Sequence, residues 1–219
     1  MHGRRPRSRS HHRVLSLRTA LVAAVAALVA ACSAPPPAAP AGDVHVYRDF
    51  TLIDGSGGPG VGHPAMVTDK GRIPWVGPVA DLKVPSGAAV EDLAGAFVIP
   101  GLINTHGHVG NVQGFTQDSK FQTTERVEKQ LATYASYGVT SVLAMGTEKD
   151  LVFPIRDAQR AGRPTFARLY TAGQGLVFSG GYGGVVGGNT PVAPVNDVDP
   201  AVEAQAAKHV DVIKFWLDS

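Results

Sequence analysis

The chain has 219 residues, of which 44% are hydrophobic and 17% charged, a composition typical of a globular protein rather than a disordered one. Its formal net charge is +2, but six arginines and no acidic residue lie in residues 1–31. The remainder holds 14 basic and 18 acidic residues and carries a charge of about −4. Nucleic-acid binding requires a basic surface, so this balance excludes nucleic acid as a partner.

Residues 1–31 have the pattern of an export signal. Arginine-rich residues precede an apolar run at 20–31, which is shorter than the roughly 20 residues needed to span a bilayer. The run ends at Cys32, the only cysteine, so no internal disulfide can form. The small residues before Cys32 resemble a bacterial lipobox, whose cysteine is acylated and becomes the mature N-terminus. Ser33 beside it indicates sorting to the outer membrane. We therefore expect an exported lipoprotein, anchored in a membrane and facing the periplasm or the cell exterior.

Two further segments come before residue 97. Residues 32–42 are rich in proline and alanine, which predicts an extended, semi-rigid tether. Residues 43–96 contain short alternating strands separated by turn signals, among them a hairpin-like segment at 69–73. We interpret residues 43–96 as part of a small β-sandwich domain.

Residues 97–219 alternate between strand and helix patterns. The expected strands cover residues 97–104, 139–145, 166–171 and 210–215. The expected helices cover residues 124–137 and 149–161, and a third opens with Asp199 as N-cap and Pro200 at its first position. The glycine-rich residues 173–190 are expected to form a loop. This α/β pattern predicts parallel strands with right-handed crossovers, and periodicity alone leaves open a doubly wound sheet or a (β/α)8 barrel.

A pair of histidines, His106 and His108, lies at the carboxyl end of the first of these strands. Residues two apart on an extended chain point to the same face, so the two imidazoles are expected side by side, with Gly107 leaving space between them. Neutral imidazole is a good ligand for zinc and similar divalent ions. The position strengthens the prediction of a metal site, because barrel enzymes place their active sites at this end of their strands.

Three segments in order, residues 71–77, 92–95 and the PGLINTHGH run at 100–108, resemble the amidohydrolase superfamily. The likeness is strongest to its imidazolonepropionase-like branch, which includes metal-dependent prolidase-like dipeptidases, and it extends over residues 44–219. The resemblance implies a TIM-type (β/α)8 barrel, of which residues 97–219 are the first half with strands one to four, preceded by part of a β-sandwich.

The resemblance also implies a role for Lys214, and the position of the glycine-rich loop suggests one for Tyr182. A lysine that ends the fourth barrel strand is commonly carboxylated in this family and bridges two metals, and Lys214 occupies that position. A lysine reacts with carbon dioxide only when neutral, and the resulting carbamate is an anionic oxygen ligand. Tyr182 lies in the glycine-rich loop after the third strand, at the expected mouth of the site, where it would contact substrate. An unremarkable flexible connection is the alternative for that loop.

The implied activity is hydrolysis of an amide-type C–N bond, in a cyclic amide or a dipeptide, by water that one or two divalent ions activate. Zinc is the expected metal, with manganese or iron as alternatives, and the substrate is a small molecule. A whole barrel needs roughly 250 residues, whereas residues 97–219 number 123. In the family two further histidines and a general-base aspartate follow later strands. The chain therefore reads as an incomplete enzyme.

Two hypotheses remain open from the residues. The chain is either the front part of an exported amidohydrolase or a non-catalytic lipoprotein remnant or fragment that keeps the fold signature. In both cases the strand at residues 210–215 would leave an open barrel edge, because the next strand is not in the sequence. Unpaired edges of this kind template association. Self-association through that edge is therefore expected.

The lipobox makes a direct prediction about the membrane. The change Cys32→Ala removes the thiol that would be acylated, so the protein should leave the membrane fraction or remain unprocessed. Membrane fractionation and the mass of the mature protein measure this, with Ser33→Ala as the control that keeps the thiol. A Cys32→Ala protein that fractionates and matures like the parent would contradict the lipobox.

Overall fold

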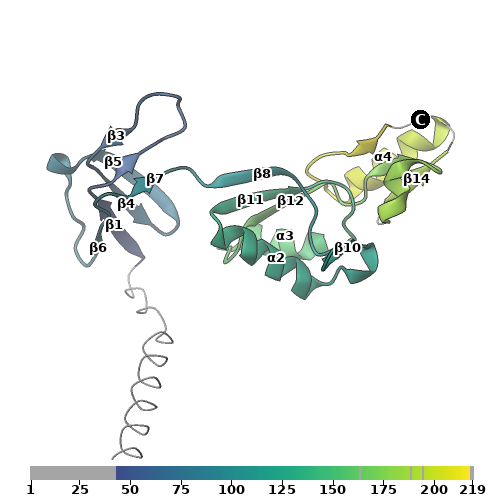
Figure 1. The fold of residues 1–219 in the computed structure, drawn as a ribbon, viewed down its shortest axis with the longest axis horizontal. Helices are drawn as coiled ribbons and strands as arrows, with labels where there is room; N and C mark the ends of the chain where they lie inside the picture. Colours follow the sequence, from purple (N-terminus) through teal and green to yellow (C-terminus); the bar gives the residue numbers. More distant parts are fainter. Residues whose placement is uncertain (1–42, 163, 188, 194, 218–219) are drawn as a thin grey trace, which may run out of the picture.

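The computed structural model describes residues 43–162, 164–187, 189–193 and 195–217. The export signal, Cys32 and the tether predicted from the sequence lie outside the described residues. Figure 1 shows a β-rich part followed by an α/β part, joined by an extended stretch of chain between β7 and β8. Within the described ranges, no helix has the length and apolar character needed to cross a membrane.

Two small sheets make up the β-rich part. The first has the strand order β5-β4-β1-β6. Its strands are β1 (Val44–Arg48), β4 (Pro64–Asp69), β5 (Arg72–Pro78) and β6 (Ala89–Asp92). The second has the order β3-β2-β7, with β2 (Thr51–Leu52), β3 (Val61–Gly62) and β7 (Phe97–Val98). A short 3-10 helix, η1 (Val79–Asp81), follows β5. The assignment of these sheets to a β-sandwich stays a prediction.

The hairpin expected at residues 69–73 joins β4 to β5. Asp69 pairs with Arg72, and the two residues between them, Lys70 and Gly71, both have positive φ angles, 47° and 74°. Two consecutive left-handed residues are the mark of a type I′ turn, whose twist matches that of the flanking strands. The hairpin expected there is therefore confirmed.

The single strand expected at residues 97–104 is wrong, because two strands in different sheets cover it. β7 pairs with β2, whereas β8 (Leu102–Gly107) pairs with β11 (Val139–Ala144). Pro100 has no N–H to donate to a ladder. A Cβ on Gly101 would lie 2.1 Å from Thr140 Oγ1, so only glycine permits this close approach to β11. The break at Pro100-Gly101 carries the chain from the second sheet to the third.

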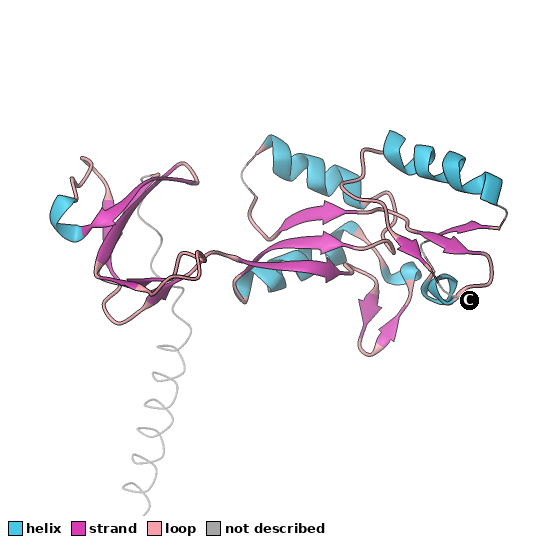
Figure 2. Ribbon diagram, turned by 90° about the horizontal axis from the view of Figure 1, so that it is seen from above, coloured by secondary structure: helices cyan, strands magenta, loops and turns pink. Residues whose placement is uncertain are grey.

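The third sheet is parallel, with the order β12-β11-β8, and its third strand is β12 (Arg168–Thr171). Between the strands run the helices α2 (Thr124–Ser136) and α3 (Val152–Ala161). Both helices lie on one face of the sheet (Figures 1 and 2). The parallel βαβ pattern predicted from the sequence is confirmed here for three strands. The first half of a (β/α)8 barrel stays a prediction.

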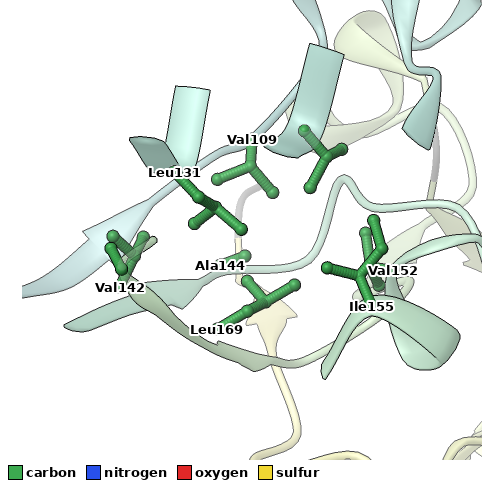
Figure 3. Close-up of a cluster of buried hydrophobic side chains, with 9 residues drawn as sticks. Val109, Leu131, Val142, Ala144, Val152, Ile155 and Leu169 are labelled. Carbon is green, nitrogen blue, oxygen red and sulfur yellow. The ribbon is translucent and has the colours of Figure 1, made fainter. Parts of the chain in front are cut away.

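A cluster of buried apolar side chains joins that sheet to its helices (Figure 3). Leu131 of α2 and Val142 of β11 are fully buried within it, and Leu169 of β12 is 2% exposed. The opposite face of the sheet is open, since Ile103 is 66% exposed and Tyr170 is 41% exposed. The sheet therefore has one covered face and one accessible face.

The helix α2 begins and ends where its sequence signals predict. Thr123 is its N-cap, and the hydroxyl accepts a hydrogen bond from the N–H of Arg126. Gly138 follows with a φ angle of 79°, as expected of a glycine that ends a helix. The helix expected at residues 149–161 is shorter at its start. Because α3 begins at Val152, Pro154 lies in the first turn, where its missing N–H costs no hydrogen bond.

A small hairpin and a short helix connect β8 to α2. The hairpin consists of β9 (Val112–Gln113) and β10 (Thr116–Gln117), and the 3-10 helix η2 (Ser119–Phe121) follows. The carboxylate of Asp118 caps η2 by accepting a hydrogen bond from the Lys120 N–H at 2.8 Å. That backbone hydrogen bond, followed by the contact with the Lys120 side chain, lowers the pKa of Asp118.

The glycine-rich segment after β12 is more ordered than the expected loop. It forms β13 (Leu176–Phe178), the 3-10 helix η3 (Tyr182–Val186) and the start of β14 (Thr190–Val192). The chain continues through the 3-10 helix η4 (Val195–Asp197) and α4 (Val198–Ala207). The expected N-cap at Asp199 is wrong by two residues, because Asp197 occupies the cap position and makes no side-chain cap bond.

The fourth strand, expected at residues 210–215, is also wrong in extent and partner. Only β15 (Phe215–Trp216) is a strand, and it pairs in parallel with β13 in a sheet of order β14-β13-β15. The preceding residues touch β12 through Asp211, whose N–H donates to the Thr171 carbonyl at 2.8 Å. The Asp211 carboxylate accepts the N–H of Thr171 at 2.9 Å. The Asp211 carboxylate therefore accepts the hydrogen bond that a backbone carbonyl of a neighbouring strand would otherwise accept from Thr171.

The buried cluster makes a prediction about stability. The change Leu131→Ala should lower the free energy of unfolding by about 2–5 kcal/mol, because it leaves a cavity between α2 and the sheet. Urea denaturation measures the loss. The change Phe115→Ala truncates a fully exposed apolar side chain at the β9–β10 turn and should cost less than about 0.5 kcal/mol. Equal effects of the two changes would show that α2 does not pack on the sheet at Leu131.

Candidate functional site

The pairing of β8 with β11 contains one extra residue that sets the direction of both histidines. Asn104 pairs with Val142 and Gly107 with Ala144, so β8 uses three residues where β11 uses two. Val142 and Ala144 are fully buried in the helix-packed cluster, which puts their partners on the covered face. The bulge therefore turns the neighbours of Gly107, His106 and His108, to the open face of the sheet.

The two imidazoles lie side by side, as expected from their spacing. Their ring centroids are 5.8 Å apart, and the ring planes are inclined by 71°. The His106 side chain is exposed, whereas that of His108 is 27% exposed. Two imidazoles near one another on an accessible face are suited to sharing a metal ion.

His108 is held through its Nδ1 atom. This nitrogen lies 2.9 Å from the hydroxyl oxygen of Thr147 and 3.5 Å from Oε1 of Glu148. The Glu148 side chain has no exposed surface. Since Nδ1 is occupied by these protein groups, Nε2 is the ring nitrogen left for a ligand.

Glu148 is the centre of a buried hydrogen-bond network at the carboxyl end of the sheet. Its Oε2 accepts the N–H groups of Gly146 at 2.9 Å and Thr147 at 3.0 Å. Its Oε1 accepts the Thr147 hydroxyl at 3.2 Å and the N–H of Val109 at 3.4 Å. One carboxylate therefore joins the segment that follows β8 to the segment that follows β11.

Lys214 reaches the same edge of the sheet from the other end of the chain. It directly precedes β15, and its carbonyl accepts the Leu176 N–H at 2.8 Å. Its side chain packs against two glycines, since an added Cβ would lie 2.8 Å from Lys214 Cγ at Gly146 and 3.0 Å at Gly175. Its Nζ lies 5.0 Å from the centre of the Trp216 ring. The lysine thus borders the residues after β11, as His108 does.

The segment before Lys214 is fixed to α3 by charge. Arg156 is 2% exposed, and its guanidinium donates to the His209 carbonyl at 2.7 Å and lies 3.5 Å from the Asp211 carboxylate. Arg160 pairs with the same carboxylate. A buried arginine with several acceptors fixes geometry better than a surface pair does. Asp211 therefore anchors the approach to Lys214.

Tyr182 opens η3 and is 72% exposed. Its neighbour Gly183 packs tightly on Trp216, because an added Cβ would lie 2.6 Å from Trp216 Cγ. The structure thus brings the Tyr182 segment next to the strand that follows Lys214. The role of Tyr182 in substrate binding stays a prediction.

The described ranges contain no group of three or more histidine, cysteine, aspartate or glutamate side chains able to hold a metal ion. The donors available at this edge are the two imidazoles and, if carboxylated, Lys214. Such nitrogen and oxygen donors suit zinc and similar ions. The chemistry of the donor set therefore fits a divalent metal, with fewer protein ligands than a closed zinc site has.

Proteins similar to this chain are known both in sequence and in structure. No family model matches the chain. It is 43% identical over 68 residues to imidazolonepropionase from Paracoccus denitrificans, and 32% identical over 120 residues to imidazolonepropionase from Pseudomonas aeruginosa. Among solved structures it superposes with a TM-score of 0.66 on a protein from Bifidobacterium longum described as a prolidase, at 23% identity. It superposes on an amidohydrolase with a TM-score of 0.64 at 21% identity. The chain is thus similar in sequence to parts of imidazolonepropionases, and it shares its fold with solved prolidase and amidohydrolase structures.

The relationship covers only part of each relative. The matches to the two imidazolonepropionases cover 30% and 54% of this chain, but 17% and 29% of those proteins. The two structural matches cover 81% and 78% of this chain, and 41% and 46% of the solved chains. The chain thus spans less than half the length of the imidazolonepropionases and of the solved chains that it matches. The structural likeness, at this level of identity, shows the fold alone.

Thr147 and Glu148 are the site residues that the sequence interpretation missed. They follow the apolar strand at residues 139–145, and they come at its carboxyl end, as His106 and His108 do on the first strand. Position after a buried parallel strand is the signal that could have found them. The network through Val109 could not be read from sequence, because its partners are 39 residues apart.

Close packing around Lys214 and Trp216 gives a testable prediction. The change Gly175→Ala places a Cβ 2.4 Å from Trp216 Cζ3, and the backbone cannot retreat because Gly175 bonds to Gly146 on one side and Thr190 on the other. Trp216 should be displaced, and its fluorescence emission, measured in a Trp75→Phe background, should shift to longer wavelength. The change Gly184→Ala meets no atom within 4 Å and should leave the emission unchanged. An unchanged spectrum for Gly175→Ala would contradict this packing.

Proposed function

We propose that this chain provides part of a metal-dependent amidohydrolase that cleaves an amide-type C–N bond in a small molecule, a cyclic amide or a dipeptide. The observation that carries the proposal is the His106–His108 pair, 5.8 Å between ring centroids, on the open face at the carboxyl end of a parallel sheet. The matches to imidazolonepropionases, and the fold shared with amidohydrolases and prolidases, support the same reaction class.

In this proposal His106, His108 and Lys214 hold one or two divalent ions, zinc in the first place and manganese or iron as alternatives. The imidazole Nε2 of His108 is directed away from Thr147, which leaves it for an ion. Two histidines alone leave zinc short of its usual four ligands, so the carbamate of Lys214 is the third donor. When bound, such an ion polarises a substrate carbonyl and lowers the pKa of water towards neutrality.

The residues of this chain are proposed to position the metal ligands rather than to transfer protons. The Glu148 network fixes the loop ends that carry His108, and Asp211 with its two arginines fixes the approach to Lys214. Tyr182, on the segment packed against Trp216, is proposed to contact substrate. The family resemblance places the general base on an aspartate that follows the eighth barrel strand.

The proposed setting is the first half of a (β/α)8 barrel that follows part of a β-sandwich. Three parallel strands with helices on one face, and an accessible opposite face, support this arrangement. Self-association through the edge at residues 210–215 belongs to the same proposal, and the edge position of β15 in the sheet of order β14-β13-β15 supports it. A lipid on Cys32, outside the described residues, would place the protein at a membrane facing the periplasm or the cell exterior.

Metal binding provides the test on the chain itself. The parent chain should bind zinc, and His106→Ala or His108→Ala should each weaken the binding by at least about 10-fold, since even an outer-shell change commonly costs 10-fold to 100-fold. The double variant should bind none. Calorimetric titration and metal content after dialysis measure this. The matched control is His63→Asn, which removes an exposed imidazole and suits that residue's φ angle of 53°. Equal zinc content in the parent and the double variant would sink the proposal.

An assay of hydrolysis distinguishes an amidohydrolase from the non-catalytic alternative. Zinc-dependent cleavage of Xaa-Pro dipeptides or of a cyclic amide, lost in His106→Ala, supports the amidohydrolase. Zinc binding without any turnover supports a chain that keeps the fold without the activity.

A further inference from the structure

We propose that Thr147 is a positioning residue, which with Glu148 holds the His108 ring in the tautomer that carries its proton on Nδ1. The inference rests on the proposed function only for the metal ion that Nε2 would bind. The tautomer itself depends on hydrogen bonds within the protein and not on a metal.

The hydroxyl of Thr147 has three neighbours. It receives the side-chain amide of Asn111, whose Nδ2 donates to Oγ1 at 2.9 Å, and Asn111 is fully buried. It lies 3.2 Å from Oε1 of Glu148 and 2.9 Å from Nδ1 of His108. A hydroxyl has one proton and two lone pairs. Asn111 occupies one lone pair, so one proton and one lone pair remain for Glu148 and His108.

The Glu148 carboxylate determines which neighbour receives the proton of the Thr147 hydroxyl and which faces its remaining lone pair. Three backbone N–H groups, those of Val109, Gly146 and Thr147, donate to its two oxygens, and the Thr147 hydroxyl oxygen lies 3.2 Å from Oε1. An ionised carboxylate has lone pairs and no proton, so it can only accept from the hydroxyl. The proton of the Thr147 hydroxyl therefore points to Glu148, and its remaining lone pair faces His108.

The lone pair of Thr147 can only accept, so Nδ1 of the neutral His108 ring must carry the proton. The nearby Oε1 of Glu148, 3.5 Å from Nδ1, favours the same arrangement because it attracts an N–H and repels a nitrogen lone pair. Nε2 is then left with its lone pair, which is the form that a metal ion requires. Within the described part of the chain, the His106 ring makes no comparable side-chain hydrogen bond.

Nitrogen NMR of the full chain labelled with 15N-histidine tests the tautomer without any metal. At about pH 8, above the ordinary histidine pKa, the parent should show a protonated, pyrrole-type Nδ1 and an unprotonated, pyridine-type Nε2 for His108. His108→Ala assigns the signals. The change Thr147→Val keeps the shape but removes the acceptor, so the His108 signals should move towards the Nε2–H form. The His106 signals should stay in place.

Two further variants make the result specific. The change Thr147→Ser restores the hydroxyl and should restore the parent His108 signals. The change Thr133→Val removes an exposed hydroxyl that bonds only to its own helix and should leave them unchanged. In zinc titrations Thr147→Val should bind about 10-fold more weakly than the parent, and Thr147→Ser within about twofold of it.

The outcomes distinguish this inference from the proposed function. Parent-like His108 signals in a folded Thr147→Val protein, or an Nε2–H ring in the parent, would overturn the inference even if zinc binds to both histidines. The expected tautomer shift with no zinc binding in the parent would support the hydrogen-bond assignment while refuting the metal site. If Thr147→Val fails to fold, the tautomer of the parent and the Thr147→Ser signals still decide the inference.

Discussion

The buried carboxylate of Glu148 is the interaction on which the arrangement of the site depends. A carboxylate without solvent contact is costly unless its oxygens are fully hydrogen-bonded, and here four donors from two strand ends satisfy it. The four donors can all reach this carboxylate only because the carboxyl ends of β8 and β11 lie side by side. The backbone N–H of Glu148 also bonds to the Gly173 carbonyl after β12, so all three parallel strands meet at this residue.

Two local features make the open face of the sheet a candidate site. The extra residue in β8 turns the imidazoles of His106 and His108 away from the helices, and the Glu148 network fixes the ring of His108. Packing of Val142 and Leu131 holds the covered face in place, which keeps the bulge where it is. Stability and candidate function thus occupy opposite faces of the same three strands.

The end of the described chain joins this site through charge and close packing. Asp211 substitutes for a ladder bond of β12, and Arg156 holds it from within α3. The chain that follows brings Lys214 against Gly146, in a space that only glycine leaves open. A lysine 106 residues after His108 therefore reaches the edge where the histidines lie.

The sequence by itself determined the parallel α/β pattern, the limits of α2 and the pairing of His106 with His108 in space. These features depend on local periodicity, on the Thr123 and Gly138 signals and on a spacing of two residues, all of which are short-range. Only the tertiary structure decided which face the histidines take, because an unbulged strand would place His106 on the same face as Asn104, against the helices. It also decided that β15 is short and pairs with β13, and that Thr147 and Glu148 hold His108. Those outcomes depend on contacts between residues about 40 positions apart, where no local pattern carries information.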